Sequence, residues 1–159
     1  MDAKDIILNI RKIVRSINLE SKRIQKEFGV SIPQLLTLVY LNEQEEFKAR
    51  QSEIKKYLNL NASTVTGLIY RLEAKGYVAK LPKTGDRRVT YVSITTKGKY
   101  IIENSPGLLH TELRDKLENM SPDQFEEVKK ASNLLVNVLG AKDVSASPVI
   151  TEHEPINFQ

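Results

Sequence analysis

Helical spacing of apolar residues dominates this chain and gives way to an alternating pattern in one stretch, after Gly76. Residues 77–81 and 89–95 are each expected to be extended, and in the second segment Thr90, Val92 and Ile94 alternate with their neighbours. A basic turn separates the two segments, which predicts a single β-hairpin. The fold class we expect is therefore mainly α with a small β-hairpin.

Capping signals divide the helical parts of the chain. Ser31 followed by Gln34, and Ser121 followed by Gln124, are capping-box patterns that open helices. Thr95 is a candidate cap for another helix, which must kink or restart at residues 105–107, where proline removes a backbone donor. The helices expected are a first one of about six turns ending near Gly29, then 31–40, 51–58, 63–74, one from 96, and 122–139. In the helix over 51–58 we expect Ile54, Tyr57 and Leu58 to face inward.

Positive charge is concentrated in the middle third of the chain. Residues 48–99 carry 12 Lys or Arg and three acidic residues, whereas residues 1–47 are neutral overall and residues 100–159 are net acidic. Such a concentrated positive field is typical of a surface that meets phosphate. A solvated basic face is the alternative that charge alone leaves open.

Several function classes are excluded or disfavoured by composition. The chain has no Cys, which excludes disulfides, thiolate nucleophiles and cysteine-ligated zinc. It has no apolar run of membrane-spanning length and no signal-peptide pattern, so we expect a cytoplasmic protein without membrane contact. The two histidines, His110 and His153, lie far apart without catalytic spacing around them. We expect no enzyme activity and no cofactor. A metal site built from His110, Glu112 and Glu103 remains an alternative.

The helix expected over residues 63–74 has an unusual outer face. Val65, Leu68, Ile69 and Leu72 fall at helical spacing and should face the core. The opposite side is small, hydroxylated and nearly uncharged, with Ser63, Thr66, Gly67, Tyr70 and Ala74. A solvent-facing helix would normally carry Lys and Glu there. Because glycine inside a helix costs about 1 kcal/mol relative to alanine, Gly67 indicates close approach of a partner, with relief of internal packing as the alternative.

Two short helices, a turn and a charged hairpin are the order of a winged helix-turn-helix. In that geometry the second helix enters the DNA major groove and the hairpin, or wing, lies near the minor groove. Asp86 is expected to hold the shape of the wing tip. The DNA-binding residues we predict are Ser63, Thr64, Thr66, Gly67, Tyr70, Arg71, Lys83, Arg87 and Arg88.

Four motifs together resemble the MarR family of bacterial and archaeal transcription regulators. They are Ser52-Glu53-Ile54, Ser63-Thr64-Val65-Thr66, residues 71–78 with the sequence RLEAKGYV, and Asp86-Arg87-Arg88 followed by Ile94-Thr95-Thr96-Lys97-Gly98. The resemblance spans residues 5–140. It departs from the family pattern at Arg50, where a Ser or Thr cap is common, and at Ile94, where Leu is usual.

The resemblance implies a homodimer that binds palindromic double-stranded DNA, with Asp86 and Arg88 at the signature positions of the wing. It divides the chain into a helical dimerisation region (1–30 and 96–140), a winged helix-turn-helix region (31–95) and a C-terminal tail (141–159). It also implies a small aromatic or anionic effector, for which Arg15 and Tyr40 are candidate pocket residues. A repressor is the role we expect.

Two alternatives remain open at this stage. The apolar stripes of the terminal helices lie outside the winged unit, and a chain this small has too little core to cover them, which favours a dimer independently of the resemblance. A monomer with an ordinary terminal bundle is the alternative. A winged-helix module that contacts an acidic protein instead of DNA would also explain the basic middle.

Overall fold

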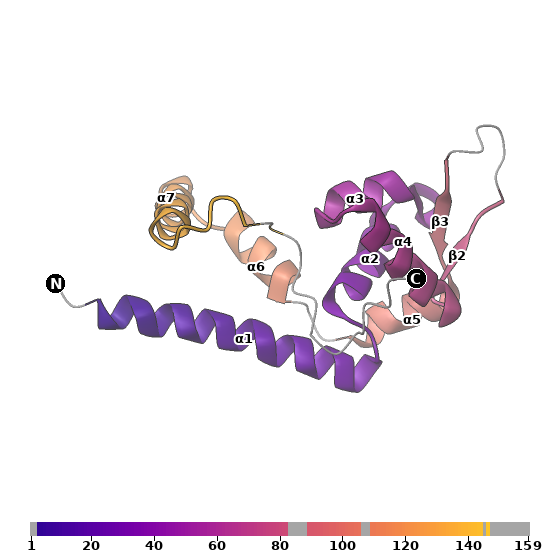
Figure 1. The fold of residues 1–159 in the computed structure, drawn as a ribbon, viewed down its shortest axis with the longest axis horizontal. Coiled ribbons are helices and arrows are strands. Elements are labelled where there is room, and N and C mark those ends of the chain that lie inside the picture. The colour runs from indigo at the N-terminus through magenta and orange to yellow at the C-terminus, as the bar shows by residue number, and fades with distance from the viewer. Residues whose placement is uncertain (1–2, 83–88, 106–108, 145, 147–159) are drawn as a thin grey trace. The chain divides into compact units, whose positions relative to one another are not determined.

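The computed structural model describes residues 3–82, 89–105, 109–144 and 146. The chain divides into two compact units, one up to Ser105 and one from Pro106 to Ala146, which we treat separately (Figure 1). In the described residues no helix has both the length and the apolar character needed to cross a membrane.

The described residues form seven α-helices and a small antiparallel sheet, a mainly helical fold as the sequence predicts. The elements of the first unit are α1 (Lys4–Phe28), α2 (Ile32–Glu43), the 3₁₀ turn η1 (Glu45–Phe47), β1 (Lys48–Arg50), α3 (Gln51–Leu58), α4 (Ala62–Ala74), β2 (Val78–Lys80), β3 (Tyr91–Ile94) and α5 (Thr96–Asn104). The second unit contains α6 (Leu109–Glu118) and α7 (Pro122–Val138).

Helix α2 is the centre of the first unit. Its start is fixed by the predicted capping box, in which the Gln34 N–H donates to Ser31 Oγ at 3.4 Å and the Ser31 N–H donates to Gln34 Oε1 at 3.0 Å. Three of its leucines are fully buried. The core around them is completed by Ile54, Val65, Ile69, Leu72 and Val92 from α3, α4 and β3. This packing holds α3 and α4 in a fixed relation to the hairpin.

The sheet has three strands in the order β1-β3-β2, all antiparallel. The hairpin of β2 and β3 was predicted, with Val92 and Ile94 buried as the alternation indicated. Strand β1 was not predicted, because three residues are too few to show an alternating pattern. It pairs with β3 through the register Ala49↔Val92. The strand is the link between α2 and α3.

A glycine allows α5 to start directly against the base of the hairpin. Thr95 caps α5, its Oγ1 accepting from the Gly98 N–H at 3.1 Å, as predicted. A Cβ on Gly98 would lie 2.2 Å from the backbone oxygen of Tyr77, which also accepts the Thr95 N–H at 3.0 Å. No side chain larger than hydrogen fits there. Gly98 is the last residue of the motif over residues 94–98 quoted above, and this close packing explains why a glycine occupies the position.

Two lysines tie the ends of three helices together. The ammonium of Lys75, the C-cap residue of α4, donates to the carbonyl oxygen of Gly29, which caps α1 in the left-handed conformation with φ 65°. Lys97 at the start of α5 donates in turn to the carbonyl oxygen of Lys75 at 2.9 Å and lies 5.2 Å from the centroid of the Tyr77 ring. The end of α1, the end of α4 and the start of α5 are therefore joined.

The second unit confirms the second capping box. Gln124 N–H donates to Ser121 Oγ at 3.3 Å, and Pro122 is the first residue of α7. The predicted break after α5 is also present, because α5 ends at Asn104 and the next described helix starts at Leu109. Pro106, the proline at this predicted break, lies outside the described residues.

One inward-facing prediction was wrong. Ile54 and Leu58 of α3 are buried, whereas Tyr57 is 36% exposed and stacks on Tyr40 of α2, with ring centroids 4.4 Å apart. Helical spacing placed Tyr57 on the correct side of the helix. It sits at the rim of that side, where a large ring finds an aromatic partner at the surface instead of a place in the core.

Candidate nucleic-acid interface

A short turn joins α3 to α4 and orients the second helix. Asn59 ends α3 in the left-handed region with φ 51°, a conformation that asparagine tolerates better than most residues. Asn61 caps α4, its Oδ1 accepting from the Thr64 N–H and from the Ser63 hydroxyl, both at 2.8 Å. The Ser63 side chain is therefore held at the N-terminal end of α4 before any partner arrives.

Helix α4 has the two faces that its sequence predicts. Val65, Leu68, Ile69 and Leu72 are all buried, with at most 2% exposure. On the opposite side Tyr70 is 65% exposed, and Ser63, Thr66 and Ala74 are exposed as well. The outer face is accordingly a surface with hydroxyl and aromatic groups and no charge.

Gly67 is open to the outside of the protein. A Cβ built at this position would meet nothing within 4 Å, and the residue has ordinary helical geometry rather than a positive φ. Neither internal packing nor backbone strain therefore explains the glycine. Of the two explanations weighed above, relief of internal packing is excluded within the described residues. The other explanation, close approach of a partner, stays a prediction.

The Thr66 hydroxyl is engaged on both sides. It donates to the carbonyl oxygen of Ala62 at 2.9 Å and accepts from Gln51 Nε2 at 2.7 Å. The second bond joins the start of α3 to the outer face of α4. Gln51 was missed by sequence reasoning, because the contact connects two helices and leaves no spacing signal. With the hydroxyl occupied, the methyl group is the part of Thr66 best placed to contact a partner.

Thr64 and Arg71 lie on one flank of α4, away from its outermost line. Both are half-buried, in contrast to Tyr70. Arg71 was expected to reach a partner together with Tyr70, but the two side chains leave the helix about 100° apart, as successive residues do. Tyr70 therefore lies on the outer face and Arg71 at its edge.

The base of the hairpin is fastened to α4. Glu73 Oε1 accepts from the Lys80 N–H at 3.2 Å, and its other oxygen pairs with the Lys80 ammonium at 3.3 Å. The bond from the Lys80 backbone N–H, helped by the ammonium, lowers the pKa of Glu73 below its ordinary value. The predicted tip residues Lys83, Asp86, Arg87 and Arg88 lie outside the described residues.

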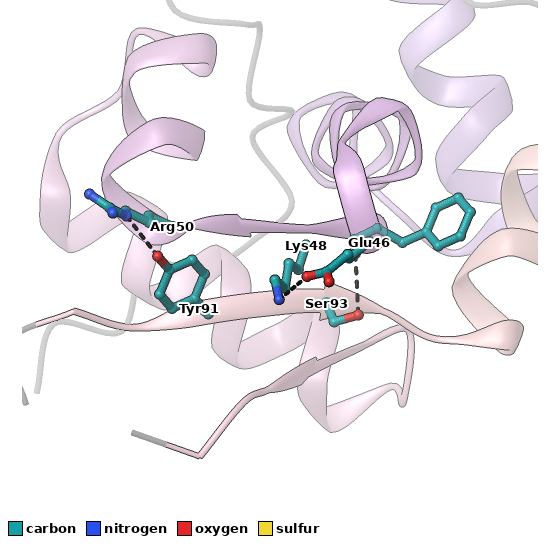
Figure 2. A network of polar contacts seen from close by, with 6 residues as sticks. Glu46, Lys48, Arg50, Tyr91 and Ser93 are labelled. Atoms are coloured by element: carbon teal, nitrogen blue, oxygen red, sulfur yellow. Dashed lines mark hydrogen bonds and ion pairs between the residues drawn. The ribbon is translucent and has the colours of Figure 1, made fainter. Parts of the chain in front are cut away.

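Arg50 is the N-cap residue of α3, and its side chain is held by Tyr91 of the sheet (Figure 2). Its Nε donates to the Tyr91 hydroxyl at 3.0 Å, and its Cζ lies 5.6 Å from the centroid of that ring. The backbone N–H of Arg50 donates to Glu53 Oε2 at 2.7 Å, which is half of a capping box. The other half is missing, because a guanidinium has no acceptor.

Figure 2 also shows the turn before β1. Glu46 pairs with Lys48, and the Ser93 hydroxyl donates to the Phe47 carbonyl oxygen at 3.2 Å. Glu46 and Phe47 both have positive φ, near 54° and 55°. These contacts hold a strained turn that directs the chain into β1 and brings Arg50 to the sheet edge.

The other predicted sites are only partly assembled. In the described part of the chain no group of three or more His, Asp or Glu side chains is placed to hold a metal ion. Arg15 lines a hollow of about 560 Å³ whose described walls are all residues of α1. Tyr40 does not line this hollow, and its ring stacks on Tyr57 of α3.

Comparison with known proteins finds a matching family and several sequence relatives. The model of the MarR family matches residues 30–90. An uncharacterized HTH-type transcriptional regulator of Bacillus subtilis, YfiV, is 28% identical over 138 residues, covering 87% of this chain and 85% of its own. The HTH-type transcriptional repressor MdtR of the same organism is 33% identical over 94 residues, 59% of each chain.

Solved structures agree on the fold. Sco3205, a MarR family transcriptional regulator from Streptomyces coelicolor crystallised in complex with DNA, superposes with a TM-score of 0.63 at 19% identity, covering 93% of this chain and 94% of its own. That likeness establishes the fold. The family match across the helices and hairpin described above, together with the sequence similarity to YfiV over most of both chains, shows that the chain belongs to the MarR family of winged helix-turn-helix transcriptional regulators.

Proposed function

We propose that this regulator binds double-stranded DNA with α4 in the major groove. The observation that carries the proposal is the outer face of α4, uncharged and open at Gly67, on a helix whose other face is locked into the core. An α-helix fits the major groove of B-DNA, and a glycine lets its backbone approach the base edges. The Sco3205 structure contains DNA, which supports the same ligand for this chain. As a member of a family of regulators, the chain is not an enzyme.

The proposed contacts divide by their position on the fold. Ser63, Thr66, Gly67 and Tyr70 face the groove, and Thr64 and Arg71 border it toward the phosphates. Lys83, Arg87 and Arg88 carry positive charge on the wing between β2 and β3, where Asp86 would fix the loop. The strong positive charge of residues 48–99 supports this assignment, because these elements all lie in that segment.

We further propose that the protein acts as a homodimer on a palindromic site. Helix α1 buries only Ser21 and Ile24, and its stripe leaves Ile6, Ile13 and Val14 each at least 51% exposed. In the second unit α7 has no buried residue, and Leu134 and Val138 are 62% and 76% exposed. Apolar faces of this extent are typical of surfaces covered by another subunit. The dimerisation region would be residues 1–30 and 96–140.

A repressor released by a small molecule is the regulatory role that we propose. MdtR is named a repressor. The hollow on α1 has an apolar wall at Ile10, Val14 and Leu19 and cations at Arg11, Arg15 and Lys22. That combination suits a small aromatic anion. Because Ile10 and Val14 also belong to the proposed dimer stripe, a ligand there would act on the arrangement of the two subunits.

The DNA proposal is tested by a titration of the purified protein on operator fragments selected from its source genome. The affinity should fall steeply with salt, with a log-log slope of about −0.9 for each phosphate neutralised. A protein that ignores these fragments at low ionic strength is not a DNA-binding regulator of this kind, and binding to an acidic protein would then be the function to examine.

The dimer is tested separately by sedimentation equilibrium. The wild-type protein should sediment at twice the chain mass of 18.1 kDa. Ile13→Glu would place a charge in the proposed interface and should shift the equilibrium toward monomer, whereas Lys12→Gln on the neighbouring surface position should not. A monomeric wild-type protein would refute the dimer and the palindrome together.

A further inference from the structure

We propose that Arg50 is a further DNA contact of this protein and that its guanidinium binds a backbone phosphate beside the groove that α4 enters. The inference rests on the proposed function, because it requires DNA against the outer face of α4. It assigns a role to a residue at which this chain departs from the common family pattern. It also adds the start of α3 and the edge of the sheet to the contact surface.

Arg50 is a poor choice for stabilising α3. An N-cap residue is normally Ser, Thr, Asp or Asn, whose side chain accepts an N–H of the first helical turn, and arginine can only donate. Glu53 supplies the compensating bond to the Arg50 backbone and leaves the guanidinium uninvolved in the cap. The cap of α3 therefore does not account for an arginine at this position.

Tyr91 fixes the direction of the Arg50 side chain without neutralising it. The Tyr91 hydroxyl accepts a hydrogen bond from Arg50 Nε, and the ring lies beside the guanidinium. The four N–H groups on the two terminal nitrogens remain available to a ligand. In the described residues Arg50 forms no ion pair. Figure 2 shows the guanidinium directed away from the Glu46–Lys48 pair. An oriented cation that keeps its full charge is suited to an incoming phosphate.

The space in front of Arg50 leads to the outer face of α4. A hollow of about 280 Å³ is bordered by Arg50, Gln51, Ser52, Val89 and Thr90, with Gln51 bound through its N–H to the Thr90 carbonyl oxygen at 2.9 Å. The Gln51 side chain bonds Thr66 on the outer face of α4. One residue therefore borders the hollow and contacts α4. DNA that receives α4 in its groove would bring a neighbouring phosphate to this hollow.

Charge and position favour a phosphate over a base as the ligand. The hollow lies between the start of α3 and the residues that lead from the wing into β3, next to the Gln51 side chain that bonds α4. The flanks of a recognition helix meet the DNA backbone rather than the base edges. A phosphate contact contributes affinity without sequence preference, and it contributes through counterion release. These two properties distinguish the proposal from a base-reading role.

The test compares wild-type protein with Arg50→Gln on the selected operator and on random-sequence duplex, each titrated with salt. With one such contact in each subunit of a dimer, the log-log slope should become shallower by about 1.8, and the affinity at 0.1 M salt should fall about 60-fold on both duplexes. Tyr91→Phe, which keeps the ring and removes the hydroxyl, should show a smaller loss in the same direction. Lys26→Gln removes an equal charge from the last turn of α1 and should change neither slope nor affinity.

The folded state is checked by circular dichroism and thermal unfolding, which should be close to wild type for Arg50→Gln because the side chain is exposed and makes no cap. A wild-type slope for Arg50→Gln on DNA that the wild-type protein binds would overturn the inference and leave the proposed function standing. A loss confined to the operator would also overturn it, because that pattern belongs to base reading. Failure of the wild-type protein to bind either duplex would overturn the proposed function and this inference with it.

Discussion

Substitutions at Gly67 separate a partner-facing role of this glycine from a structural one. Within the described chain a Cβ at this position meets nothing within 4 Å, and the backbone is ordinary helix. Gly67→Ala should therefore stabilise the folded protein by about 1 kcal/mol, the difference in helix propensity. For a chain of this length that corresponds to a rise in melting temperature of roughly 2–4 °C.

The same substitutions should weaken DNA binding in proportion to their size. An added methyl group should cost a few-fold in affinity. Overpacking a close interface costs about 1–3 kcal/mol. Because Gly67→Leu would alter both subunits of the dimer, the binding free energy should weaken by about 2–6 kcal/mol. Because each 1.4 kcal/mol is tenfold, the affinity for operator should fall by at least about 30-fold. Leucine is a good helix former, so the Gly67→Leu protein should be at least as stable as wild type.

Fluorescence anisotropy with labelled operator and thermal unfolding by circular dichroism provide the two measurements on the same preparations. The expected result is opposite signs, with higher stability and weaker binding. Wild-type affinity for a folded Gly67→Leu would refute the close approach of DNA to α4. A destabilised Gly67→Ala would instead refute the absence of internal contacts on which the reasoning depends.

Three further predictions concern the framework that positions this face. Gly98→Ala should lower the unfolding free energy by about 2 kcal/mol or more in urea titrations, since its Cβ would collide with the Tyr77 carbonyl; an unchanged midpoint contradicts this packing. Asn61→Ala should cost about 0.5–2 kcal/mol in the same titrations through the lost cap of α4, and no loss would contradict the cap. For Glu73 the folded pKa is lowered, so its stabilisation is present above the ordinary value of 4.5 and disappears as the pH falls through the folded value. The difference in urea midpoint between wild type and Glu73→Gln should accordingly shrink in acid, and a constant difference would contradict the bond to Lys80.

Local signals in the sequence predicted most of the helical frame. The capping boxes at Ser31 and Ser121, the cap at Thr95 and the four-residue stripe of α4 are all present. Each depends on contacts between residues at most one or two helical turns apart, which spacing alone can reveal. Gly67 belongs to the same class, because an outward glycine on a helix is recognised from the helical repeat.

The missed features depend on contacts between distant residues. Strand β1 has only three residues, and its conformation is set by pairing with β3 more than 40 residues later. The bond from Gln51 to Thr66 and that from Arg50 to Tyr91 likewise join separate elements. Tyr57 followed the helical repeat but ended at its rim. Sequence spacing carries no information about which partner such residues meet.

The lysine bonds at the end of α4 give this helix a fixed pivot. Lys75 is anchored on the carbonyl of Gly29 at the end of α1, so a rotation of α1 would act on that end of α4. The 13 residues of α4 make a lever of roughly 20 Å. A tilt of about 10° of α4 together with the elements packed on it would displace Ser63, at the other end, by about 3 Å, which is the full length of a hydrogen bond. Hinging of this small amplitude would be enough to disengage the helix from DNA while every element stays folded.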